Sequence, residues 1–127
     1  MPRRIAIAAL QMDANPAPTH ERLKIADRLA REAHEKGAQL VVLPEVFNTG
    51  YGYTDANYER TETLEGPTVT WMKETARELD IHLAGSLFPL DGNEIYNALL
   101  LFAPDGRMWR YDKFYPPGWE SAYFREG

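Results

Sequence analysis

The sequence contains no cysteine, and this absence excludes several kinds of chemistry. Without thiols the chain forms no disulfide and offers no thiolate ligand to a metal ion. It also lacks the thiol that forms covalent intermediates in many enzymes. Covalent catalysis through sulfur is therefore excluded for the 127 residues as they stand.

An excess of positive charge and long hydrophobic runs are missing as well. The chain has 14 lysine and arginine residues against 19 acidic ones, a formal net charge of -5, which disfavours a nucleic-acid groove. No apolar run approaches the roughly 20 residues of a membrane-spanning helix, so we expect no membrane partner. The apolar start at residues 5–10 is short for a signal peptide, and no small-residue cleavage site follows it. We therefore expect a cytoplasmic protein whose first strand lies here.

Motifs for metal and nucleotide binding are also lacking. His20 and His34 stand too far apart along one predicted helix to share a ligand, and His82 is alone in a predicted strand. No glycine-rich phosphate loop follows the first predicted strand, which weakens the case for a nucleotide-binding α/β domain. The sequence therefore predicts no metal site.

The composition that is present is typical of one ordinary globular domain. Apolar residues make up 44% of the chain and charged residues 26%. The alternation of strand and helix patterns places the chain in the α/β class, and a right-handed crossover makes the first two strands parallel. The predicted strands are residues 5–12, 40–43, 81–86, 95–102 and 108–112, and the predicted helices are residues 19–37 and 67–79.

The stretch LVVLPEVFNTGY over residues 40–51 is the centre of the predicted fold. Its four leading apolar residues predict a strand buried on both faces, as in a parallel sheet. Pro44 ends this strand because it has no N–H to donate. Glu45 follows at the point where open α/β sheets place their ligands. Glu45 is thus a candidate functional carboxylate, and a solvated charge at a strand end is the alternative.

Two further ionisable residues follow other segments in comparable places. Lys113 comes directly after the predicted strand 108–112, and Glu120 lies in the terminal loop. A carboxylate and a lysine at strand ends can serve as a base and as a cation for a developing oxyanion. On spacing alone, an ordinary surface ion pair of small energetic value is the simpler interpretation. Aromatic residues in the same loops either wall a substrate pocket or hold the loops by packing: Phe47, Tyr51, Tyr115 and Trp119.

Three segments resemble the carbon–nitrogen hydrolase, or nitrilase, superfamily, and they occur in that family's order. LPEVFNTGY at residues 43–51 resembles the segment around the family's catalytic glutamate. YDK at 111–113 resembles the segment of its catalytic lysine, and ESAYFREG at 120–127 resembles the segment of a second active-site glutamate. The resemblance covers essentially the whole chain, and further positions that fit it are Gln11, residues 65–67 and Asn97.

The resemblance implies a mechanism and a fold. In the family a cysteine attacks an amide or nitrile carbon and forms a thioester, which water then hydrolyses. By resemblance Glu45 is the general base, Lys113 stabilises the tetrahedral intermediate, and Glu120 positions the lysine or substrate and assists proton transfer. The resemblance also implies no cofactor, a small amide, carbamoyl or nitrile substrate, and an α-β-β-α four-layer sandwich that commonly forms homo-oligomers.

The chain departs from the family in length and in its nucleophile. Family members are considerably longer, and their cysteine lies downstream of the second glutamate. We therefore expect residues 1–127 to be an incomplete domain, the N-terminal half of the sandwich, with one sheet face bare and prone to association. The segment FYPPG at 114–118 differs from the His-Leu-like continuation of many relatives. The alternative is a non-catalytic binding or assembly module that retains the same pocket.

Overall fold

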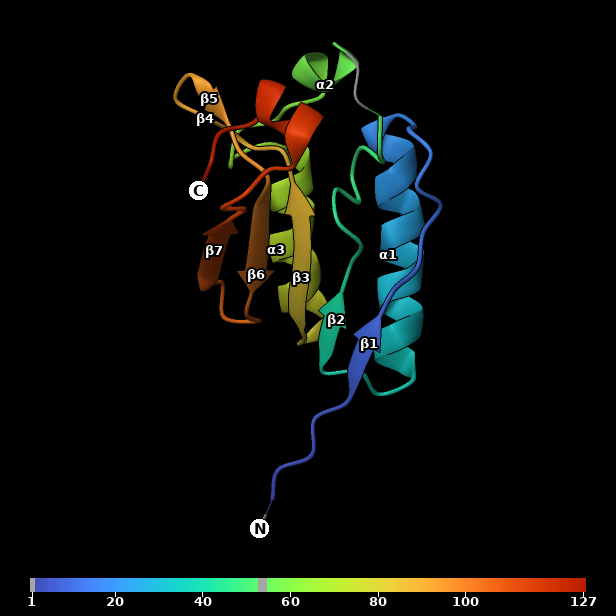
Figure 1. The fold of residues 1–127 in the computed structure, drawn as a ribbon. Helices are drawn as coiled ribbons and strands as arrows, with labels where there is room; N and C mark the ends of the chain where they lie inside the picture. Colours follow the sequence, from blue (N-terminus) through green and yellow to red (C-terminus); the bar gives the residue numbers. More distant parts are fainter. Residues whose placement is uncertain (1, 53–54) are drawn as a thin grey trace.

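The centre of the fold is a five-stranded sheet with the order β1-β2-β3-β6-β7 (Figure 1). The computed structural model describes residues 2–52 and 55–127. The strands of this sheet are β1 (Ile7–Ala9), β2 (Leu40–Val42), β3 (His82–Leu87), β6 (Ala98–Phe102) and β7 (Met108–Asp112). β1, β2 and β3 are parallel, whereas β6 pairs antiparallel with both β3 and β7. The predicted α/β class and the parallel pairing of the first two strands are confirmed.

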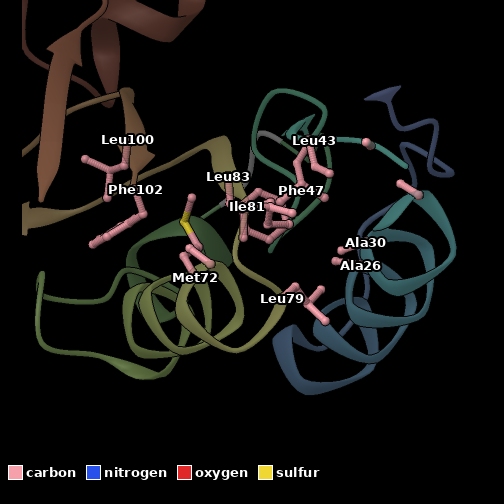
Figure 2. Close-up of a cluster of buried hydrophobic side chains, with 14 of the residues drawn as sticks. Ala26, Ala30, Leu43, Phe47, Met72, Leu79, Ile81, Leu83, Leu100 and Phe102 are labelled. Atoms are coloured by element: carbon pink, nitrogen blue, oxygen red, sulfur yellow. The ribbon is translucent and has the colours of Figure 1, made fainter. Parts of the chain in front are cut away.

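Two helices, α1 (Thr19–Glu35) and α3 (Pro67–Leu79), pack on one face of this sheet. Proline suits the first turn of α3 because its missing N–H would have no partner there. Val69, Met72, Ala76 and Leu79 recur at helical spacing along α3 and are buried. The alanines of α1 let that helix lie close to the sheet. Figure 2 shows the resulting core between the sheet and the helices, with side chains from both, including Ala26, Ala30, Met72, Leu79, Leu83, Leu100 and Phe102.

The opposite face of the sheet is exposed along much of its width. In β6 the residues alternate, so Leu100 is buried while Leu99 remains 42% exposed. The register pairs Leu99 with Tyr111, which places both on the outer face. Tyr111 is 61% exposed and Ile7, on β1, is 64% exposed. The bare face expected of half a sandwich is present, and the association predicted from it stays a prediction.

The expectation that residues 40–43 are buried on both faces is wrong for this chain. Val41 and Leu43 are buried in the core, whereas Leu40 and Val42 are only half-buried. The physical reason is the alternation of a strand, since Leu40 and Val42 point to the sheet face that no helix of the described residues covers.

Other differences from the predicted elements are local. The predicted strand 95–102 is divided into β5 (Glu94–Ile95) and β6, and β5 pairs with β4 (Leu90–Asp91) in a hairpin. The loop after β2 contains the short helix α2 (Ala56–Glu59), and the terminal segment contains a 3₁₀ turn at Gly118–Ala122. Each is shorter than the window in which hydrophobic periodicity can be recognised.

Candidate active site

The topology of the sheet brings Glu45 and Lys113 to the same edge. β7 is antiparallel to β6, and β6 is antiparallel to β3, so β7 runs in the direction of β2 and β3. The carboxyl ends of β2 and β7 therefore lie at one edge, the upper edge in Figure 1. Glu45 follows β2 and Lys113 follows β7, as the sequence predicts.

At this edge the ammonium group of Lys113 lies between two carboxylates. Its Nζ is 3.1 Å from Glu45 Oε1 and 2.9 Å from Glu120 Oε2. The side chain of Glu120 is only 2% exposed, whereas that of Lys113 is 33% exposed. The structure thus brings the three predicted site residues together, and the burial of Glu120 distinguishes the cluster from an ordinary surface ion pair.

Two neutral side chains hold the carboxylate of Glu45. Asn97 donates from Nδ2 to Glu45 Oε1 at 2.7 Å, and the hydroxyl of Tyr51 donates to Oε2. The main-chain carbonyl of Asn97 also accepts from the N–H of Lys113 at 2.8 Å. Asn97 therefore fixes both the carboxylate and the lysine. Sequence reasoning noted Asn97 without placing it in the site, although an amide within an apolar strand must find a partner when buried.

The partners of Glu45 and Lys113 keep both groups charged. Burial by itself raises the pKa of Glu45, but hydrogen bonds from Tyr51, Asn97 and Lys113 outweigh it, and the net pKa lies below that of a free glutamate. Burial by itself lowers the pKa of Lys113, but its bonds to Glu120 and Glu45 have a larger effect in the opposite direction. The net pKa therefore lies above that of a free lysine. At neutral pH the site therefore presents an ionised carboxylate that can accept a proton beside a fixed cation.

A hollow of about 260 Å³ lies beside these groups and opens on the bare face of the sheet. Apolar walls with a few convergent polar groups are typical of sites for small molecules. Leu99 and Tyr111 also line the hollow, although the sequence does not indicate this role. The register of β6 and β7 determines which sheet face each side chain occupies. The full lining is Leu43, Glu45, Ser86, Asn97, Leu99, Tyr111 and Lys113.

The four aromatic residues predicted near the site are placed differently from one another. Tyr51 reaches the site through its bond to Glu45. Phe47 is fully buried in the core of Figure 2, with its ring 5.8 Å from that of Trp71, and does not line the hollow. Tyr115 is 76% exposed and packs edge-on against Phe114. The side chain of Trp119 lies outside the described residues. The structure thus brings Tyr51 to the site but neither Phe47 nor Tyr115.

The loop that carries Tyr51 lies very close to the loop after β1. Gly50 has a φ of +74°, and a Cβ added there would lie 2.6 Å from the carbonyl oxygen of Asn15. The N–H of Tyr51 donates to the carbonyl of Ala14 at 2.7 Å. Only glycine fits this approach, because it combines a positive φ with the absence of a side chain.

We expect Gly50→Ala to destabilise the chain more than Gly92→Ala, its matched control. Gly92 also has a positive φ, of +62°, but a Cβ there would meet nothing within 4 Å. The difference between the two variants isolates the steric clash with Asn15, which should be about 1–2 kcal/mol. Urea denaturation measures both free energies of unfolding. Equal losses at the two positions would contradict the close approach of the loops.

The groups at this site suit proton transfer, and the structure describes no candidate metal centre. Among residues 2–52 and 55–127, no group of three or more histidine, aspartate or glutamate side chains is arranged to hold a metal ion. In the same part of the chain, no helix has the length and apolar character needed to cross a membrane.

The sequence is similar to known proteins of one family. The chain matches the carbon–nitrogen hydrolase family over residues 6–127. A nitrilase from Pyrococcus abyssi is 30% identical over 126 residues, which are 97% of this chain and 48% of the nitrilase. The omega-amidase NIT2 of Danio rerio is 37% identical over 106 residues, which are 83% of this chain and 37% of that enzyme. The chain thus spans half or less of the length of these relatives.

Comparison of the fold gives the same result. An amidase from Nesterenkonia sp. superposes with a TM-score of 0.83 and 29% identity, over 97% of this chain and 48% of the amidase. A mutant of that amidase in complex with butyramide gives a TM-score of 0.82 at 28% identity, over 97% of this chain and 48% of its own. A protein of the same superfamily from Xanthomonas campestris gives 0.80 at 27% identity, over 92% of this chain and 44% of its own. The chain belongs to the carbon–nitrogen hydrolase family.

Proposed function

We propose that this chain supplies the N-terminal half of a domain that hydrolyses a non-peptide carbon–nitrogen bond in an amide, a carbamoyl compound or a nitrile. The observation that carries the proposal is the contact of Lys113 with both Glu45 and Glu120 beside the hollow. Among the family relatives are a nitrilase and omega-amidases, and one similar amidase structure contains butyramide. These relatives support a small neutral substrate whose reacting carbon is bonded to nitrogen.

Glu45 acts as the base in this proposal. A thiol attacks carbon effectively only after losing its proton, and in this proposal the ionised Glu45 carboxylate accepts that proton. For an amide, the sulfur–carbon bond forms, the carbon–nitrogen bond breaks, and the proton held by Glu45 passes to the departing nitrogen. Ammonia or an amine is released, and a thioester remains. Glu45 then takes a proton from water while the water oxygen bonds to the carbon. The carbon–sulfur bond breaks, the sulfur receives the proton from Glu45, and the carboxylic acid is released.

Lys113 stabilises the negative oxygen of the tetrahedral intermediate. Its ammonium group has three N–H donors, and in the described residues two of its directions are set by Glu45 and Glu120. The third remains for a substrate oxygen in the hollow, where a fixed cation stabilises a developing negative charge. The buried carboxylate of Glu120 keeps the lysine from turning away, and it can assist the proton transfers.

In this proposal the nucleophile comes from a part of the domain outside this sequence. The chain has no cysteine, and it spans 48% of the nitrilase relative. The hollow opens on the bare face of the sheet, which exposes Leu99 and Tyr111. We propose that the second half of an α-β-β-α sandwich packs on this face and places its cysteine at the hollow.

Intact mass and an activity screen of the native protein test this proposal together. The expected result is a species near twice the 14.5 kDa of this chain, which releases ammonia, an amine or a carboxylic acid from one of the three substrate classes. The screen should compare amides, carbamoyl compounds and nitriles at neutral pH. A native protein that contains a second half with cysteine but hydrolyses none of them would refute the hydrolase proposal.

The absence of cysteine favours one second candidate, a non-catalytic module that binds a ligand or partner through the same hollow. A mature native species of 14.5 kDa without hydrolytic activity would support it. The same experiments therefore separate the two candidates. A homo-oligomeric assembly of the complete protein and its location in the cytoplasm are further proposals, which gel filtration and cell fractionation test.

A further inference from the structure

The main chain makes an unusual turn directly after Glu45. Val46 has a φ of +47°, a region in which a β-branched residue is a rare outlier. Such a conformation is strained and persists only where the surroundings impose it. The N–H of Val46 donates to Ser86 Oγ at 2.8 Å, and its carbonyl accepts from the N–H of Gly50 at 2.9 Å. The backbone that aims Glu45 is therefore under constraint from several sides.

One of these constraints is a buried arginine on α1. Arg22 is only 4% exposed, and its Nε donates to the carbonyl of Phe47 at 2.7 Å. Its Nη1 donates to the carbonyls of Asp13 and Asn15, both at 2.9 Å. Because the guanidinium group is a rigid planar fork, these bonds tie the turn after Glu45 to the loop after β1.

A buried cation stabilises this position less than an apolar side chain would. Burial lowers the pKa of Arg22, and the charge of Asp13 offsets this only in part, so the guanidinium stays charged at a desolvation cost. An apolar side chain of similar volume fills such a space at lower cost. Arg22 instead fixes the relative position of two separate segments, since its hydrogen bonds end on main-chain carbonyls of both.

Hydrogen bonds connect these two segments to the carboxylate of Glu45. The N–H of Tyr51 donates to the carbonyl of Ala14, which lies between the two residues of the β1 loop that Arg22 binds. The hydroxyl of Tyr51 donates in turn to Glu45 Oε2. A shift of the β1 loop therefore moves the Tyr51 hydroxyl relative to Glu45.

We propose that Arg22 is a positioning residue for Glu45. Its guanidinium clamps residues 13–15 against residues 47–51, and the clamp holds both the Val46 turn and the Tyr51 hydroxyl at the Glu45 carboxylate. The catalytic consequence rests on the proposed function of Glu45 as base, whereas the clamp itself is a property of this chain.

Arg22→Lys tests the clamp, because lysine keeps the charge but loses the fork. Arg22→Met is the second variant, and Arg31→Met is the matched control on the same helix. Arg31 is 40% exposed and binds the side chains of Asp27 and Glu78 on the surface. In the 127-residue chain, NMR follows the titration of the Glu45 carboxyl carbon and the hydrogen exchange of the Tyr51 amide, and circular dichroism follows folding.

In Arg22→Lys we expect the Tyr51 amide to exchange about tenfold faster or more, because its loop opens locally. The titration of Glu45 should move to higher pH, because a displaced Tyr51 hydroxyl no longer favours the carboxylate. Arg31→Met should leave both readouts at the wild-type values. A folded Arg22→Lys variant that melts earlier but keeps both wild-type readouts would show a merely structural arginine and overturn the proposal. If Arg22→Met does not fold, the two NMR readouts of Arg22→Lys alone decide whether the clamp exists.

The complete protein supplies an independent arm of the test. There Arg22→Lys should lower kcat/KM about 10- to 100-fold, mainly through kcat, since displacement of a catalytic group by about 1 Å has effects of this size. A wild-type protein that hydrolyses no amide, carbamoyl compound or nitrile refutes the proposed function and leaves the NMR test of the clamp valid. An active protein whose Glu45 titration is unchanged in Arg22→Lys refutes the clamp alone.

Discussion

Glu45→Gln is expected to lower kcat/KM of the complete protein about 10²- to 10⁴-fold, the typical contribution of a general base. Glutamine has nearly the shape of glutamate, and its amide oxygen can still accept a hydrogen bond from Tyr51 or Asn97. It cannot take a proton from a thiol or from water. The loss should therefore appear in the rate of chemistry, measured as ammonia or amine release under single-turnover conditions.

Glu32→Gln is the matched control for this substitution. Glu32 lies on α1 and forms an exposed pair with Lys36 at 2.8 Å, away from the hollow. This variant should hydrolyse substrate at the wild-type rate. Near-wild-type turnover by a folded Glu45→Gln protein would contradict the assignment of the base and would direct attention to Glu120.

Lys113→Met is expected to lower the free energy of unfolding by about 3 kcal/mol, because it removes the cation from a carboxylate that is buried. Glu120 is 2% exposed, so water cannot solvate its charge without local rearrangement. Methionine fills most of the space of the lysine stem, which limits the loss of packing. Urea denaturation of the 127-residue chain at neutral pH measures the change.

Two further variants show whether the loss of unfolding free energy in Lys113→Met comes from the unpaired charge of Glu120. Lys36→Met breaks an exposed pair and should cost about 0.3–0.5 kcal/mol. Adding Glu120→Gln to Lys113→Met removes the buried charge and should recover most of the lost stability, as expected for residues that interact directly. A loss below about 1 kcal/mol in Lys113→Met would indicate that solvent reaches Glu120 more easily than its burial implies.

Much of the fold was predictable because its signals are local. The apolar run 40–43 ends at Pro44, and the patterns of α1 and α3 have the helical period, so these elements lie where the sequence predicts them. The convergence of Glu45, Lys113 and Glu120 was predicted from short motifs whose order along the chain matches a known family. The sheet topology supplies the physical reason, since β2 and β7 end at the same edge.

The remaining features depend on information that is not local. Nothing in the sequence near Val46 indicates a positive φ, yet this turn directs Phe47 into the core and away from the hollow. Whether Leu40 and Val42 are covered depends on which elements reach the outer face of the sheet. The clamp of Arg22 joins two segments through their main-chain carbonyls, which carry no side-chain signature.

Asn97 anchors both Glu45 and Lys113. Its side chain holds Glu45 while its carbonyl holds the backbone of Lys113, so both charged groups are attached to a single point of the sheet edge. Because both groups are attached to the same residue, we expect the distance between the Glu45 carboxylate and the Lys113 ammonium to change less than the distance from either group to the surrounding loops.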